Sequence, residues 1–175
     1  MLTVYERDAL RRGGLTRYDR RMAKRRAVSA EPSLRIRDFL ALVHDGVIAR
    51  LGESLGGFDW RQRFGYVQYY RQSSAVHYEI WVQRKTARLE IGLHFEGERE
   101  ANYAAAEALA IRAPDVQARI GPEYELEEWT AQWTRLHRSF AAPALTPQLA
   151  DDAARHAVAL MQGMEPILDE MEIVR

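Results

Sequence analysis

HYEIWVQRKTARLEIGLHFE, residues 77–96, carries the clearest structural pattern in the sequence. Polar and apolar residues alternate on both sides of the charged segment RKTA, and a period of two around a polar turn is typical of a β-hairpin with one buried face. The run FGYVQYYR, residues 64–71, alternates in the same way and is joined to the hairpin by QSSA. The sequence therefore predicts a three-stranded antiparallel meander.

The two turns also predict which residues face each other. If each turn is centred on its polar residues, Val67 pairs with Ile80 and Tyr69 pairs with Tyr78. The partners of Ile80, Tyr78 and Val76 on the third strand are then Ile91, Leu93 and Phe95. These residues form one continuous apolar surface, and we expect helices to cover it, because antiparallel sheets commonly pack on one face.

The other face of the predicted meander is polar and aromatic. It places Tyr66 beside Trp81 and His77 opposite His94, and directly paired side chains lie about 5 Å apart. Such a face can hold a small ligand or a partner. The candidate ligand-binding residues are Tyr66, Tyr70, His77, Glu79, Trp81, Glu90 and His94.

His77, Glu79 and His94 also form a candidate metal site, because two histidines with a carboxylate can bind iron or zinc. No HExxH or comparably specific spacing supports it, and exposed antiparallel faces often mix histidine, glutamate and aromatic residues. The chain has no cysteine, which removes disulfides, thiolate catalysis and cysteine-ligated zinc from consideration. We therefore predict no bound metal and no cofactor, and keep these three residues as the alternative.

An aromatic sheet face can stack nucleic-acid bases, but the acidic residues on this face argue against that. Its glutamates are Glu79, Glu90 and Glu96. With Arg88 as the one fixed cation among them, the face would repel phosphate. A neutral or cationic small ligand or a partner protein fits better. In the simplest interpretation, the C-terminal helix of the chain covers Trp81 and Tyr66.

Two helices are expected around the meander. Ser33 is a candidate cap for a helix that continues to Gly52, because apolar residues recur on one face of this segment. EREANYAAAEALAIRA, residues 98–113, predicts an alanine-rich helix that Pro114 interrupts or restarts.

A long helical region is expected over residues 145–171 at the C-terminal end. Thr146 is its predicted cap and Pro147 occupies the first position, where proline is favoured. Gly163 and Pro166 are expected to bend or split it.

The segment GPEYELEEWTAQWTRLHRSF, residues 121–140, is ambiguous. Its apolar residues Leu126, Trp129, Trp133, Leu136 and Phe140 fall at helical spacing. Glutamates early and arginines late in the segment also favour a helix. On the residues alone we expect a helix here.

The formal net charge of zero hides a basic N-terminal arm and linker, residues 1–32. Residues 15–27 have the spacing of a helix. Its cations are Arg17, Arg20, Arg21, Lys24, Arg25 and Arg26. They are candidates for binding nucleic-acid phosphates or an acidic protein partner. The alternative is a solvated extension, since short charge runs are commonly soluble tails.

Length and composition favour one α+β domain over residues 33–175. The chain has 175 residues of which 47% are hydrophobic, enough for one substantial core. No apolar run approaches the roughly 20 residues of a membrane helix, and the first residues lack the apolar centre of a secretory signal. We expect a cytoplasmic protein that does not bind membranes.

The order of these parts resembles an uncharacterised family of prokaryotic domains of unknown function. The resemblance rests on a meander ending in ARLEIGLHFEGERE, a helix near NYAAAEAL, then VQARIGPEYELEEW and TRLHRSF, and a long terminal helix. It covers residues 34–171. Members of the family often lie beside restriction-endonuclease-like modules, which implies a role in nucleic-acid transactions or defence systems. The resemblance also implies that YELEEW and WTRLHRSF are further strands, and we follow it on this point.

Catalytic patterns are poorly matched. A restriction-type nuclease needs paired carboxylates and a lysine, but Gln83 stands where the second carboxylate would follow Asp59, and Lys85 lies in the predicted turn. Ser73 and Ser74 lack the elbow motif of a serine hydrolase.

We therefore expect an antiparallel sheet, a three-stranded meander extended by one or two strands, packed on one face by helices. The predicted function is a non-catalytic binding or accessory domain with a protein partner. The alternative is a small-ligand-binding or metal-dependent enzyme that uses the polar sheet face.

Overall fold

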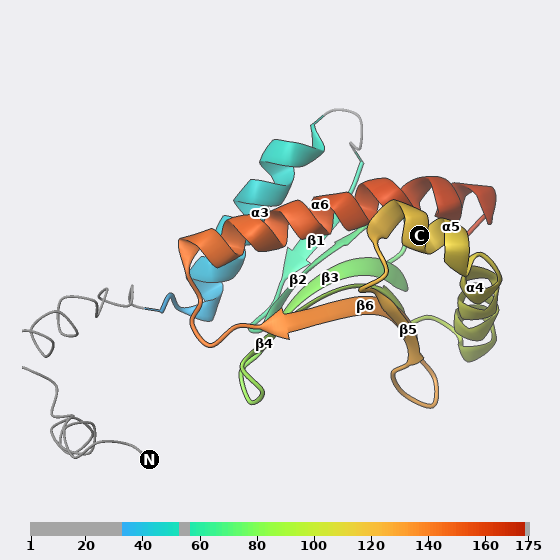
Figure 1. Ribbon diagram of the computed structural model, residues 1–175, viewed down its shortest axis with the longest axis horizontal. Coiled ribbons are helices and arrows are strands. Elements are labelled where there is room, and N and C mark those ends of the chain that lie inside the picture. Colours follow the sequence, from blue (N-terminus) through green and yellow to red (C-terminus); the bar gives the residue numbers. More distant parts are fainter. Residues whose placement is uncertain (1–32, 53–56, 174–175) are drawn as a thin grey trace, which may run out of the picture. The chain divides into compact units, whose positions relative to one another are not determined.

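The computed structural model describes residues 33–52 and 57–173 (Figure 1). This part of the chain forms an α+β domain with four helices and one six-stranded antiparallel sheet. The predicted basic helix over residues 15–27, and its six candidate phosphate-binding cations, lie outside the described residues.

The sheet has the strand order β1-β2-β3-β4-β6-β5, and all neighbouring strands are antiparallel. The strands are β1 (Asp59–Gln62), β2 (Tyr66–Tyr70), β3 (Val76–Gln83), β4 (Arg88–Phe95), β5 (Glu125–Glu128) and β6 (Thr134–Ala141). The predicted meander is β2-β3-β4, which forms the centre of this sheet.

The predicted register of the meander is confirmed. Val67 pairs with Ile80, and Tyr69 pairs with Tyr78. The third strand follows the same pattern, with Ile80 opposite Ile91. The apolar members of these pairs are buried, as the period of two requires when one face of a sheet packs on a core.

The sheet is wider than the meander because β1 extends it on one side and β6 and β5 extend it on the other. β5 and β6 confirm the strands implied by the family resemblance, and the helix expected from spacing is wrong. Leu126 and Leu136 pair across this hairpin, while the Trp129 N–H donates to the Trp133 carbonyl at 3.0 Å near its turn. The apolar residues of this hairpin therefore recur every three to four residues, as they would in a helix, although they lie on two strands and the turn between them.

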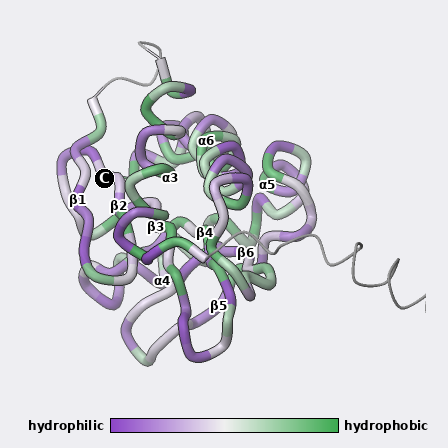
Figure 2. Tube along the Cα trace, turned by 90° about the vertical axis from the view of Figure 1, so that its left-hand side faces the viewer, coloured by the Kyte–Doolittle hydropathy of each residue, from purple (hydrophilic) through white to green (hydrophobic). Residues whose placement is uncertain are grey.

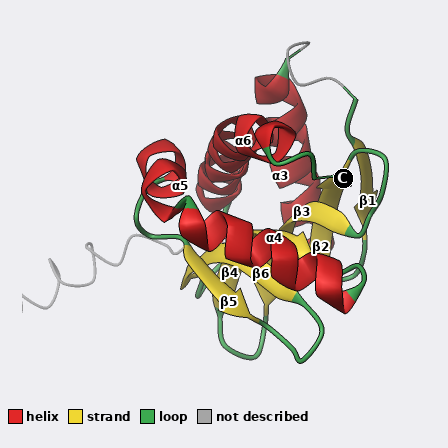
Figure 3. Ribbon diagram, turned by 90° about the vertical axis from the view of Figure 1, so that its right-hand side faces the viewer, coloured by secondary structure: helices red, strands yellow, loops and turns green. Residues whose placement is uncertain are grey.

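The apolar face of the sheet is covered by helices α3 (Ile36–Leu51) and α6 (Pro147–Glu170), which lie side by side (Figure 1; Figure 3). Their close approach depends on Gly46, because a Cβ there would lie 2.8 Å from the Cβ of Ala154. Tyr78 on β3 donates from its hydroxyl to Glu165 on α6 at 2.8 Å. Figure 2 shows hydrophobic residues concentrated in α3, α6 and the central strands. None of the described helices combines the length and apolar character needed to cross a membrane.

Helices α4 (Arg99–Ile111) and α5 (Ala113–Ile120) confirm that Pro114 restarts the helix. Asn102 on α4 is 2% exposed and fastens this helix to two loops. Its amide accepts from Gly97 N–H at 3.0 Å and donates to the carbonyls of Gly97 and Gln132, each at 2.9 Å. The β5–β6 hairpin is therefore held in place from α4.

The predicted helix ends are partly confirmed. Thr146 caps α6, since its hydroxyl accepts from Leu149 N–H at 3.1 Å. Ser33 does not cap α3: the N-cap is Arg35, and the Ser33 hydroxyl accepts from Leu145 N–H instead.

The expected split of α6 at Gly163 and Pro166 is wrong, because the helix continues to Glu170. Gly163 serves close packing, since a Cβ there would lie 2.5 Å from the Cγ2 of Ile120 on α5. The residues around Pro166, namely Met164, Ile167 and Leu168, are fully buried, and this packing outweighs the one backbone hydrogen bond that a proline removes.

Candidate functional site

The polar face of the sheet is organised around Gly92 in the middle of β4. Gly92 pairs with Glu79 on β3 and with His137 on β6. A Cβ at Gly92 would lie 2.8 Å from the His137 Cβ and 3.1 Å from the His94 Nε2. The missing side chain leaves the space that the His94 imidazole occupies.

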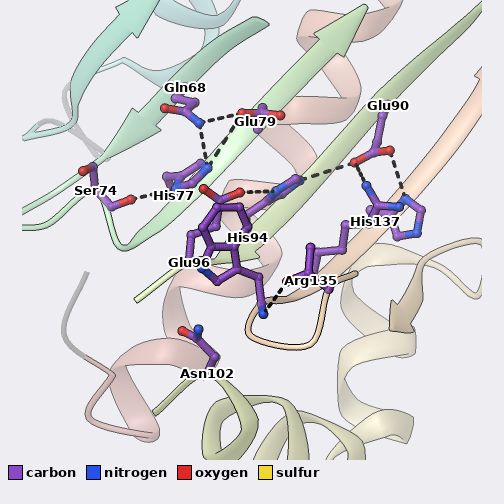
Figure 4. Close-up of polar contacts among 12 residues, drawn as sticks. Gln68, Ser74, His77, Glu79, Glu90, His94, Glu96, Asn102, Arg135 and His137 are labelled. Carbon is purple, nitrogen blue, oxygen red and sulfur yellow. Dashed lines mark hydrogen bonds and ion pairs between the residues drawn. The ribbon is translucent and has the colours of Figure 1, made fainter. Parts of the chain in front are cut away.

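Around this point lies a set of polar side chains, buried except for the half-buried Glu96, here called the polar network (Figure 4). Its members are Gln68, His77, Glu79, Glu90, His94, Glu96, Arg135 and His137. The His94 ring lies between two carboxylates, with Nε2 3.4 Å from Glu90 and Nδ1 3.4 Å from Glu96. Arg135 donates to Glu90 at 2.7 Å. Glu90 and His94 are 1% and 0% exposed, so these ionic contacts are shielded from water.

The network holds His94 in its charged form. Burial alone would lower the pKa of His94, but the carboxylates of Glu90 and Glu96 outweigh it and raise that pKa to about 9. Burial would likewise raise the pKa of Glu90, but contacts with His137 and His94 and the charge of Arg135 lower it to about 2. The two buried cations, His94 and Arg135, therefore offset the negative charge of the carboxylates that they contact, as buried charges require.

His77 is held in its neutral form beside this cation. Burial and the charge on His94 lower the pKa of His77 to about 4. Its Nδ1 lies 2.8 Å from the Ser74 carbonyl and its Nε2 lies 2.8 Å from the Gln68 amide nitrogen. Gln68 also donates to Glu79 at 2.5 Å. One tautomer satisfies all of these contacts: Nδ1–H donates to Ser74, and Nε2 accepts from Gln68.

A metal ion has one candidate set of ligands in this network. One ligand atom each from His77, His94 and Glu96 lies within 4.8 Å of the other two. Glu96 thus takes the place that the sequence prediction gave to Glu79. The Ser74 carbonyl orients His77 as second-sphere groups orient metal-bound histidines, but binding through its Nε2 would require Gln68 to move away.

Next to the network, the polar face opens into a groove of about 660 Å³, here called the aromatic groove. Its aromatic side chains are Phe64, Tyr66, Trp81 and Trp129, and its charged side chains are Arg84, Lys85 and Arg135. The Trp81 and Trp129 rings meet edge to face with their centroids 6.2 Å apart. The Arg135 guanidinium lies 5.0 Å from the centre of the Trp129 ring. All charged residues that line the groove are cations.

This groove corrects the electrostatic expectation for the polar face. Glu79 and Glu90 are 5% and 1% exposed, and Glu90 is paired with Arg135 and His94. The third glutamate, Glu96, is half-buried and contacts His94. None of the three lines the groove that a ligand would meet. The predicted repulsion of phosphate therefore does not apply to the groove.

The expected cover of Trp81 and Tyr66 by the C-terminal helix is also wrong. α6 packs on the opposite face of the sheet, where Glu165 contacts Tyr78. Trp129, from the turn of the β5–β6 hairpin, contacts Trp81 instead.

The structure divides the seven candidate ligand-binding residues into three groups. Tyr66 and Trp81 line the groove, and the members of the buried network are His77, Glu79, Glu90 and His94. Tyr70 belongs to neither set, and the Arg61 guanidinium lies 5.8 Å from its ring centre.

The residues that sequence reasoning missed come mostly from turns. Phe64 precedes β2 and is 84% exposed, while Arg84 and Lys85 belong to the β3–β4 turn and Trp129 to the β5–β6 turn. The two adjacent cations in the predicted RKTA turn were the signal available in the sequence. Arg135 was placed on the expected helix and so was not connected to Trp81.

A scan against protein-family models, a search of curated proteins and a search of solved structures each found no match to this chain.

Proposed function

We propose that this chain is a non-catalytic binding domain whose aromatic groove takes a planar, anionic ligand of the nucleotide class. The observation that carries the proposal is the composition of the groove: Trp81 and Trp129 offer ring surfaces, and every charged lining residue is a cation. Aromatic rings stack on planar ligands, and arginine and lysine bind phosphate. Other ligand pockets are likewise mostly apolar with a few polar groups.

Two cations in the groove are available to a ligand. Within residues 33–52 and 57–173, Arg84 and Lys85 are exposed and make no ion pair with a carboxylate. Arg135, in contrast, is held by Glu90 and Glu127 and serves to fix the Trp129 ring. Arg84 and Lys85 are therefore the phosphate-binding residues in this proposal.

Burial of the polar network supports binding rather than catalysis. His77 and His94 have strongly shifted pKa values, a feature common among catalytic groups, yet they are 1% and 0% exposed. A general acid or base must come within hydrogen-bond reach of the reacting atom. These histidines contact their own neighbours instead, and we assign them to the support of the groove.

The test is a calorimetric titration of the full-length protein with uridine monophosphate and with uridine. The nucleotide is expected to bind more tightly than the nucleoside, and Trp81→Ala is expected to weaken binding by about tenfold, which corresponds to about 1.4 kcal/mol. Trp60→Ala is the matched control, because Trp60 is 48% exposed and stacks on His44 outside the groove. Equal affinities for the two ligands, or equal effects of the two variants, would refute the proposal.

A metal-dependent function is the second candidate, and the proximity of ligand atoms from His77, His94 and Glu96 favours it. Elemental analysis of the purified protein tests it. Stoichiometric zinc, iron or manganese that is lost in the His77→Ala, His94→Ala double variant would establish this function, while metal-free protein with intact nucleotide binding would exclude it.

A further inference from the structure

A second hollow adjoins the aromatic groove at the β3–β4 hairpin. It has a volume of about 520 Å³ and is here called the hairpin pocket. The two hollows share Ile36, Phe64, Val82, Gln83 and Arg84. A ligand longer than one nucleotide can therefore pass from one to the other along the exposed Phe64 ring.

The charges of the hairpin pocket match those of the groove. Its charged lining residues are Arg35, Arg84 and Arg88, so the two hollows together present five cations and no carboxylate among their described lining residues. Residues 33–175 as a whole contain 16 arginines and lysines against 21 aspartates and glutamates. A run of cations in a domain with excess negative charge is a local feature, and it matches a chain of phosphates.

Aromatic residues line the two hollows together with these cations. Phe64 is 84% exposed and belongs to both, while Trp81 and Tyr66 line the groove only. Proteins that bind single-stranded nucleic acid combine such rings, on which bases stack, with cations that follow the backbone. Paired bases inside a duplex do not offer their faces to a side chain, which favours an unpaired strand.

We propose that the occupant of the two hollows is a single-stranded nucleic acid. Its bases stack on Trp81 and Phe64, and its phosphates follow Arg84, Lys85 and Arg88. This inference rests on the proposed function, because it uses the same groove, and it adds the hairpin pocket as a second subsite. Phosphate contacts give affinity without reading sequence, so we expect little base preference.

The experiment measures fluorescence anisotropy of a labelled twelve-nucleotide uridine oligomer bound to the full-length protein, with uridine monophosphate measured by calorimetry. The oligomer is expected to bind at least about tenfold more tightly than the mononucleotide, because a second subsite adds stacking and phosphate contacts. Raising the salt concentration of the assay from about 50 to about 200 mM is expected to weaken oligomer binding steeply, because binding of the phosphates releases counterions.

Two variants separate this inference from the proposed function. The double variant Arg35→Ala, Arg88→Ala removes cations of the hairpin pocket only, and it should weaken oligomer binding by about tenfold while leaving mononucleotide binding unchanged. Arg119→Ala removes an exposed cation of α5 that lines neither hollow, and it should change neither. Thermal melting of each variant confirms that it is folded.

The remaining outcomes decide whether the single-strand inference fails alone or together with the proposed function. If the mononucleotide binds and the oligomer binds no more tightly, or if the double variant leaves oligomer binding unchanged, the single-strand inference is overturned while the proposed function stands. If neither ligand binds, both fail. Equal or tighter binding of a duplex of the same length, or of a poly-glutamate peptide, also overturns the inference, since the site would then recognise negative charge alone.

Discussion

His77 and His94 face each other on β3 and β4 with their ring centroids 5.4 Å apart, yet their protonation is displaced in opposite directions. Burial and the neighbouring cation lower the pKa of His77 to about 4. Burial acts on His94 as well, but Glu90 and Glu96 raise its pKa to about 9. Two histidines in one buried pair thus differ in charge over most of the neutral range, because the carboxylates contact only one of them closely.

This pair predicts a stability maximum near pH 6.5, the ordinary pKa of histidine. The stability that His94 contributes is present below pH 6.5 and is lost as the pH rises through about 9. The stability associated with neutral His77 is present above pH 6.5 and is lost as the pH falls through about 4. The free energy of unfolding therefore falls on both sides of the maximum, along an acidic limb and an alkaline limb. Each fall is on the order of 3 kcal/mol, from 1.36 kcal/mol per pKa unit.

Urea unfolding between pH 4 and pH 9 measures both limbs. His94→Gln should flatten the alkaline limb and His77→Gln the part of the acidic limb nearest neutrality. Stability that keeps rising from pH 6.5 to pH 9 would show that His94 is not held as a cation. Titration of the two imidazoles by NMR gives their pKa values independently.

Gly92→Ala is expected to destabilise the domain by about 1 to 3 kcal/mol, the usual cost of forcing an extra group into a packed site. The new Cβ would lie 2.8 Å from the Cβ of His137, which is fixed by the backbone, and 3.1 Å from the His94 ring. Gly65→Ala is the control, because its Cβ would meet its nearest neighbour at an ordinary 3.7 Å. Equal midpoints of urea unfolding for the two variants would contradict this account of the His94 position.

The register of the meander could be predicted because local features specify it. Two polar turns and a strict period of two leave one pairing that puts all the apolar residues on the helix-covered face, and a slip by one residue would put His77 on that face in place of Tyr78. β1 was not predicted, because its four residues are half-buried or exposed and carry no apolar alternation. For β5 and β6 the spacing of Trp129 and Trp133 was misleading, since both lie around a hairpin turn rather than on a helix.

The only part of the candidate site that could be predicted is the part that the pairing of consecutive strands determines. Tyr66, Trp81, His77 and His94 share a face by register, and the structure confirms this. That the carboxylates of this face are buried depends on the β5–β6 hairpin and on its Arg135, which lies 45 residues after Glu90 in the sequence. No periodicity within β3 or β4 contains this information, so the sign of the charge that lines the groove was misjudged.

Ile91→Asp is expected to unfold the domain. Ile91 is 1% exposed at the centre of the sheet. The aspartate would bury an unpaired carboxylate and would also lose the packing of the isoleucine. Together these two costs are expected to exceed the stability of the domain, which is typically about 5 to 15 kcal/mol. Loss of the far-UV circular dichroism signal measures this, with Lys85→Asp in the exposed turn as the control. An unchanged melting temperature of Ile91→Asp would mean that the two sheet faces are reversed.

The basic arm predicted from the sequence is tested in the full-length chain. The variant for this test replaces six cations of the arm by serine: Arg17, Arg20, Arg21, Lys24, Arg25 and Arg26. If they bind phosphates, the slope of log affinity against log salt should become shallower, by about 0.7 per lost contact on a single strand. An unchanged slope would leave the arm as a site for a protein partner or as a solvated extension.

The most direct test of the aromatic groove is NMR observation of the tryptophan indole N–H signals during titration with the uridine oligomer. The account predicts that the signals of Trp81 and Trp129 shift together and saturate with the oligomer, because both rings line the groove. Trp60, which stacks on His44 with ring centroids 3.9 Å apart, should remain unshifted. Saturable binding that leaves the Trp81 and Trp129 signals unchanged, or that shifts Trp60 instead, would contradict the account.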